Sequence, residues 1–184
     1  ISHPDPTIKR SSGYLAPKFT NNSILGPTYF QPYYYVLSKA SDVVITPGLT
    51  FNEGPIIAAD YRKLRSKGSI FVKGSLTRGS MKKTDGTESN KMRGHINIKA
   101  IERLDEEWIA GMNVIRASDA TYLPRYGLEK KRFGNLTQRA HLSGQGDGFY
   151  SEIESLYFQP MDSSKSNRQV PLILPNIKTI WTKH

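Results

Sequence analysis

The chain has 184 residues, of which 26 are Lys or Arg and 16 are Asp or Glu, so its formal net charge is +10. It contains no cysteine, which excludes disulfides, thiolate metal ligands and a cysteine nucleophile. No apolar run approaches the ~20 residues that a transmembrane helix needs. The excess of positive charge suggests an anionic partner: nucleic acid, a phospholipid surface or a phosphorylated glycolipid. Composition does not choose among these three.

Two aromatic segments near the start of the chain each carry a proline. Residues 12–22 contain Pro17, and residues 26–37 contain Pro32 together with four tyrosines. Aromatic residues favour strands, whereas a proline removes a ladder hydrogen bond and is normally confined to an edge strand or a bulge. We therefore predict two neighbouring extended strands that are weakened at their prolines. A proline-punctuated loop beside an aromatic cluster is the alternative.

The rest of the chain alternates between apolar and polar residues, with a period of two that is typical of strands. The expected strands cover residues 43–51, 56–63, 70–77, 94–101, 108–117, 135–143, 148–159 and the chain from 170 onward. Polar loops are predicted over 78–90, 118–133 and 160–169. With the first two segments, this makes nine or ten strands of roughly ten residues, joined by alternately short and long connections. Strands of this length suit a membrane-spanning barrel, because backbone groups in hydrocarbon must all be paired. A soluble β-sandwich, whose strands are usually shorter, is the alternative.

The sequence offers no recognisable catalytic or metal-binding motif. None of His3, His95, His141 and His184 lies at a metal-binding spacing, and neither a nucleophile elbow nor a Walker loop occurs. The glycine-rich run 144–148 precedes no predicted helix, so a hairpin turn is expected there instead of a phosphate cradle. We predict no catalytic residue, no metal and no cofactor.

Basic residues cluster in the first half of the chain. Arg62, Lys63, Lys73 and Arg78 would face a polar lumen or the lipid headgroups in a membrane barrel. In a nucleic-acid binder they would neutralise phosphates, with the tyrosines as stacking platforms. An ordinary solvated rim is the third interpretation.

Several motifs resemble one known family. Residues 9–17 read K-R-S-S-G-Y-L-A-P, residues 29–37 read Y-F-Q-P-Y-Y-Y-V-L, and residues 41–47 read S-D-V-V-I-T-P. In this order they resemble the start of the barrel domain in the LptD family of lipopolysaccharide-assembly proteins. Residues 59–64 and 118–122 resemble later, less specific motifs of that family, although Lys63 stands where the family often has an aromatic residue.

This resemblance implies an all-β, antiparallel, up-and-down meander that forms a fragment of a large outer-membrane β-barrel. Residues 1–184 would be a partial barrel domain with its first strands at 12–37 and no complete second domain. The chain opens without an initiator methionine and stops within an alternating segment, which also suggests a piece of a longer polypeptide. In the family, lipopolysaccharide passes from a periplasmic jellyroll into the barrel and leaves through a lateral gate. The prolines that weaken this gate match Pro17 and Pro32.

The implied partners are lipopolysaccharide, a plug lipoprotein of the LptE type and the periplasmic lipopolysaccharide-bridge proteins, in the outer membrane of a Gram-negative bacterium. No enzyme activity, cofactor or nucleic acid is implied. The alternative function is that of a soluble, basic β-domain that binds nucleic acid, which would show steeply salt-dependent affinity.

Overall fold

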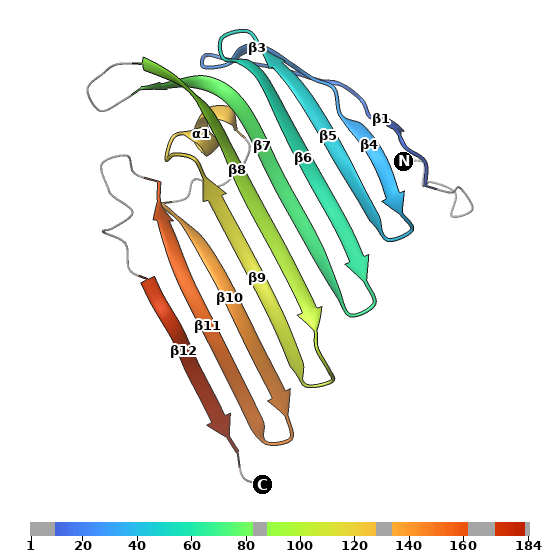
Figure 1. Cartoon of the computed structure of the whole chain (residues 1–184), viewed down its shortest axis with the longest axis vertical. Helices are drawn as coiled ribbons and strands as arrows, with labels where there is room; N and C mark the ends of the chain where they lie inside the picture. The colour runs from blue at the N-terminus through green and yellow to red at the C-terminus, as the bar shows by residue number, and fades with distance from the viewer. Residues whose placement is uncertain (1–9, 83–87, 128–133, 162–171, 183–184) are drawn as a thin grey trace.

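The computed structural model describes residues 10–82, 88–127, 134–161 and 172–182. These residues form one curved antiparallel sheet whose strands follow one another in chain order (Figure 1). The sheet has 12 strands in ten antiparallel passes, because β1 with β2 and β3 with β4 each form one pass. The strands are β1 (Gly13–Tyr14), β2 (Lys18–Asn22), β3 (Gly26–Phe30), β4 (Tyr33–Ser38), β5 (Ser41–Thr50), β6 (Gly54–Arg65), β7 (Gly68–Lys82), β8 (Glu88–Arg103), β9 (Trp108–Ala117), β10 (Asn135–Gly146), β11 (Phe149–Pro160) and β12 (Leu172–Trp181). The predicted up-and-down, all-β fold is confirmed.

The sheet does not close on itself. Among the described strands, β1 and β2 form one edge and β12 forms the other, with no strand joining them. An unpaired edge exposes a row of backbone donors and acceptors that can pair with further strands. The arrangement is that of a segment of barrel wall.

The two faces of the sheet differ in polarity. One row of paired residues runs Val43, Tyr61, Val72, Ile98 and Val114 across five strands. The adjacent row on the other side runs Asp42, Arg62, Phe71, Lys99, Asn113 and Arg139. We call these the apolar face and the polar face. Many large side chains of the apolar face are exposed, including Leu49 at 65% and Ile177 at 66%.

The connections alternate in length, as predicted. At one end of the sheet the turns cover only residues 39–40, 66–67, 104–107 and 147–148. At the opposite end the chain between strands covers 23–25, 51–53, 83–87, 118–134 and 161–171. We refer to these as the short-turn end and the long-loop end. Bacterial outer-membrane barrels show the same asymmetry between their two ends.

Two loop predictions need correction. The polar loop expected over 78–90 is largely strand, because β7 and β8 pair as far as Lys82 and Glu88. Met81 is the one large apolar residue among 78–82 and 88–90, so the sequence shows no alternation there, although the backbone still forms a ladder. The loop expected over 118–133 contains a helix, α1 (Tyr122–Tyr126), which ends at Gly127 in the left-handed conformation that glycine tolerates. The loop expected over 160–169 lies mostly outside the described residues.

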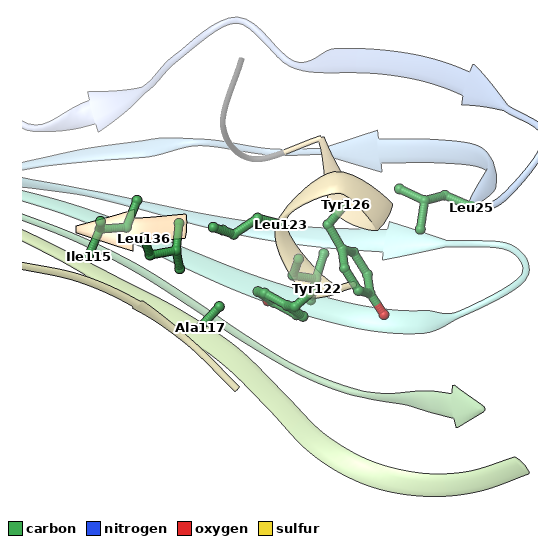
Figure 2. Close-up of a cluster of buried hydrophobic side chains, with 8 residues drawn as sticks. Leu25, Ile115, Ala117, Tyr122, Leu123, Tyr126 and Leu136 are labelled. Atoms are coloured by element: carbon green, nitrogen blue, oxygen red, sulfur yellow. The ribbon is translucent and has the colours of Figure 1, made fainter. Parts of the chain in front are cut away.

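The small helix α1 organises the buried core. It packs on the polar face, where Tyr122, Leu123 and Tyr126 are buried together with Leu136 and Ile115 from the strands (Figure 2). Within the described residues, no helix is long and apolar enough to cross a membrane. The core therefore sits near the long-loop end, between the sheet and the segment that joins β9 to β10.

Candidate functional site

The first two passes of the sheet meet at a set of one-sided hydrogen bonds around the prolines. The Leu15 amide donates to the Pro32 carbonyl at 2.9 Å, but Pro32 has no N–H to donate in return. The Gln31 side-chain amide instead donates to the Leu15 carbonyl at 3.0 Å. The Tyr29 hydroxyl donates to Gln31 Oε1 at 2.6 Å, which orients this amide. A side chain thus takes the place of a missing backbone donor.

The pairing register also shifts at this point. Leu15 lies opposite Pro32 and Lys18 lies opposite Phe30, so Ala16 and Pro17 together face the single residue Gln31. Two residues opposite one is the arrangement of a β-bulge, which disrupts the ladder locally. We call residues 15–18 and 30–32 the proline seam. Pro17 interrupts the first predicted strand, which is split into β1 and β2. Pro32 interrupts the second predicted strand, which is split into β3 and β4.

A third proline, Pro47, lies on the other side of Gln31. The Gln31 backbone amide donates to the Pro47 carbonyl at 3.1 Å, and Pro47 has no N–H to return the bond. Three residues without a backbone donor therefore surround Gln31. Sequence reasoning found the prolines but missed Gln31, for which only its place next to Pro32 offered a signal.

A charge cluster on the polar face holds the start of the first pass. Arg62 donates to the Asp42 carboxylate through Nε at 2.8 Å and Nη2 at 3.1 Å. Arg10, which precedes β1, reaches the same carboxylate and the Tyr34 hydroxyl. Asp42 is almost fully buried between these two cations. The cluster fixes one end of the edge strand, whereas the proline seam interrupts the middle of that strand.

The long-loop end of the polar face carries a second ionic cluster. Arg93 in β8 donates to both oxygens of Asp119 at 2.9 Å and to Thr121 Oγ1 at 2.8 Å. Its guanidinium carbon lies 5.5 Å from the Tyr122 ring centroid and 5.8 Å from that of Tyr126. Burial opposes ionisation of Asp119, but hydrogen bonds from Arg93, Thr121 and Ser118 outweigh it and lower its pKa to about 2. The pair anchors the segment that leads into α1.

Three more polar contacts hold α1 against the sheet. The Tyr122 hydroxyl lies 2.7 Å from Ser75 Oγ, which in turn lies 2.7 Å from His95 Nδ1. The Tyr126 hydroxyl donates to Glu53 Oε2 at 3.1 Å, and Arg125 donates to Oε1 of the same carboxylate at 3.0 Å. Burial raises the pKa of both tyrosines, so both hydroxyls remain neutral at physiological pH.

The four basic residues singled out from the sequence do not gather into one patch. Arg62 and Lys73 lie on the polar face, where Lys73 Nζ is 4.0 Å from Asp60 Oδ1. Lys63 and Arg78 lie on the apolar face, toward the short-turn and long-loop ends respectively. A nucleic-acid surface would need these cations on one side. Within the described residues, no group of three or more His, Cys, Asp or Glu side chains could hold a metal ion.

A curved antiparallel sheet with one polar face, one apolar face and unequal connections defines a segment of an outer-membrane β-barrel. Residues 91–184 match the family model LptD, described as LPS transport system D, and the chain belongs to this family.

Relatives in several bacteria support this assignment. The chain is 26% identical over 156 residues to the LPS-assembly protein LptD of Pseudomonas aeruginosa strain UCBPP-PA14, covering 82% of this chain and 17% of the relative. It is 30% identical over 114 residues to that of Ralstonia nicotianae, covering 62% and 13%. With the protein of Methylococcus capsulatus it shares 22% identity over 175 residues, covering 92% and 16%. The chain therefore spans only about a sixth of the first of these relatives.

Proposed function

We propose that the chain is part of the wall of a larger outer-membrane β-barrel that assembles lipopolysaccharide in the outer leaflet without catalysis. In this proposal the proline seam lies at a lateral exit, and Pro17 and Pro32 make the first pass easier to separate. The proposal rests on one observation: the Gln31 side-chain amide takes the place of the backbone N–H that Pro32 lacks. One side-chain hydrogen bond is easier to break and re-form than a continuous ladder.

The division of the sheet into two faces supports the membrane assignment. The apolar face would meet lipid, and the polar face would line an aqueous lumen. Trp108, Phe149 and Trp181 form a chain of aromatic contacts at the short-turn end, with ring centroids 6.4 and 5.7 Å apart. Phe19 and Tyr29 pack at the long-loop end, with centroids 4.9 Å apart. Aromatic girdles at both membrane interfaces are typical of outer-membrane barrels.

The partners follow from the same proposal. Lipopolysaccharide would be the transported substrate, and Arg62 and Lys73 would contact either it or a plug lipoprotein of the LptE type in the lumen. Lys63 and Arg78 would lie near the lipid headgroups. Periplasmic lipopolysaccharide-bridge proteins would deliver the substrate to the barrel, of which residues 1–184 would be one part.

The test is to restore backbone donors at the seam of the full-length protein. Pro17→Ala and Pro32→Ala, combined, should tighten the edge strand and lower the amount of lipopolysaccharide that reaches the cell surface. Pro27→Ala is the matched control, since Pro27 lies in β3 opposite Asn21, away from Gln31. Unchanged surface lipopolysaccharide in the double variant, at equal protein abundance, would reject the exit assignment.

A further inference from the structure

The apolar face contains a hollow that begins at the proline seam. It crosses β3, β5, β6, β7 and β8, and Gln31, which directly follows β3, lines its first edge. Its main lining side chains are Tyr29, Pro47, Leu49, Ile57, Leu76 and Met92. Five neighbouring strands span about 20 Å, which suits an extended hydrocarbon chain lying across them. The hollow is therefore long, apolar and continuous with the seam.

Within the part of the chain that the structure describes, one cation lines this hollow. Arg78 follows Leu76 on the apolar face of β7 and pairs in register with Met92. Among the described residues none forms an ion pair with Arg78, whereas Arg62, Arg93, Arg125 and Arg139 on the polar side all have carboxylate partners. A cation on a lipid-facing surface is costly at the middle of the bilayer and inexpensive at the interface. Its place at the long-loop end puts Arg78 where phosphate groups would be within reach.

We propose that this hollow binds one acyl chain of a phosphorylated glycolipid, with Arg78 bound to its phosphate. The proposal rests on the function proposed above, since it makes the hollow the first resting place of lipopolysaccharide after the proline seam. The guanidinium supplies several donors in a planar fork that matches phosphate oxygens. The aliphatic and aromatic side chains supply an apolar bed for the chain beside it.

The experiment places a photo-crosslinking residue at Leu76 of the full-length protein in lipid nanodiscs. The probe is radiolabelled bisphosphorylated lipid A, the acylated anchor of lipopolysaccharide. A second crosslinking position at Ile45, on the apolar face of β5 outside the hollow, reports random lipid contact. We expect labelling at Leu76 to exceed labelling at Ile45, and Arg78→Ser to lower it about tenfold, as expected for loss of a charge-assisted hydrogen bond.

Matched variants separate charge from position. Arg78→Lys should retain part of the labelling, and Lys63→Ser, which removes a cation from the other end of the same face, should leave it unchanged. Dephosphorylated lipid A should label Leu76 as weakly as the Arg78→Ser variant does. Equal labelling at Leu76 and Ile45, or labelling that inorganic phosphate alone abolishes, would overturn the proposal.

The two proposals fail in different ways. If the protein delivers lipopolysaccharide to the cell surface but Leu76 is not labelled above Ile45, the hollow is not a binding site and the proposed function stands. If Leu76 is labelled selectively in a protein that delivers none, the binding site stands and the proposed function is wrong.

Discussion

Arg93 and Asp119 form a two-bond ion pair that joins β8 to the segment leading into α1, with both N–O distances at 2.9 Å. The Arg93 side chain is only 1% exposed. Removing one partner of a buried pair leaves an uncompensated charge, which commonly costs about 3–5 kcal/mol. We therefore expect this pair to be a major anchor of α1 on the polar face.

The first prediction concerns release of α1. Asp119→Ala should detach residues 118–127 from the sheet, because Arg93 loses its carboxylate and Thr121 loses a hydrogen-bond acceptor. Hydrogen exchange of this segment in the full-length protein should rise by at least about a hundredfold, the equivalent of about 3 kcal/mol. Asp147→Ala, in the exposed β10–β11 turn, is the control. Protection that survives in Asp119→Ala would show that the contacts of Tyr122, Arg125 and Tyr126 are sufficient to hold the helix.

The second prediction is a pH dependence with a defined sign. The pKa of Asp119 is about 2 in the folded protein, below its ordinary value of 3.8. Its contribution to docking, about 2 kcal/mol, is therefore fully present above pH 3.8 and is lost as the pH falls through 2. Pepsin cleavage within residues 118–127 should rise as the pH falls from 4 to 2. Because Asp119→Asn cannot be protonated there, its cleavage should not depend on this titration.

The third prediction uses the close approach of α1 to β7. A Cβ atom at Gly79 would lie 2.6 Å from the Tyr126 hydroxyl and 3.1 Å from Glu53 Oε2. Gly79→Val should displace Tyr126 and break its hydrogen bond to Glu53, which a rise in hydrogen exchange at 122–127 would report. Gly134→Val, where nothing lies within 4 Å of the added Cβ, serves as control. Equal exchange in both variants would contradict the packing of α1.

The sequence predicted the parts of this fold that depend on local periodicity. Alternation located most strands and the alternating connections, and the prolines marked the irregular edge. Alternation did not assign the side chains of each strand to one face of the sheet, because Phe71 and Ile101 interrupt the polar pattern. The register resolves this: both lie on the polar face, whereas Trp108 lies on the apolar face. Only pairing across strands carries that information.

The site around α1 could not be predicted, for a different reason. A five-residue helix with a proline inside it has almost no intrinsic stability, so its formation depends on tertiary contacts. These contacts join residues far apart in the chain, such as Arg125 and Glu53. Arg93 lies in β8, next to residues 78–90, whose polarity predicted a loop. The burial of the Arg93 side chain follows only from the fold.

The fourth prediction tests the assignment of faces. Val72 and Phe71 are neighbours in β7 that point to opposite faces. In the full-length protein in a bilayer, Val72→Lys should destabilise the barrel by about 2–4 kcal/mol, the cost of a lysine at mid-membrane on the lipid side. Phe71→Lys should cost much less, because its side chain would reach a wet lumen. Denaturant unfolding in vesicles measures both, and equal losses would contradict the assignment of the apolar face to lipid and the polar face to the lumen.

The last prediction concerns the hydrogen bond that substitutes for the missing Pro32 donor. Gln31→Met keeps the size of the side chain but removes the donor to the Leu15 carbonyl, so the first pass should separate more readily. Hydrogen exchange at the Leu15 amide, which donates to Pro32, should increase. Gln138→Met is the matched control, since the Gln138 side-chain nitrogen is buried without a hydrogen-bond partner.

Adding Pro32→Ala to Gln31→Met should reverse the increase, because a backbone N–H then faces the free carbonyl. The effects of the two substitutions on hydrogen exchange should therefore be strongly non-additive, because the Gln31 amide and a backbone N–H at position 32 would donate to the same Leu15 carbonyl. If Gln31→Met leaves exchange at Leu15 unchanged, the side-chain amide contributes nothing to closing the seam.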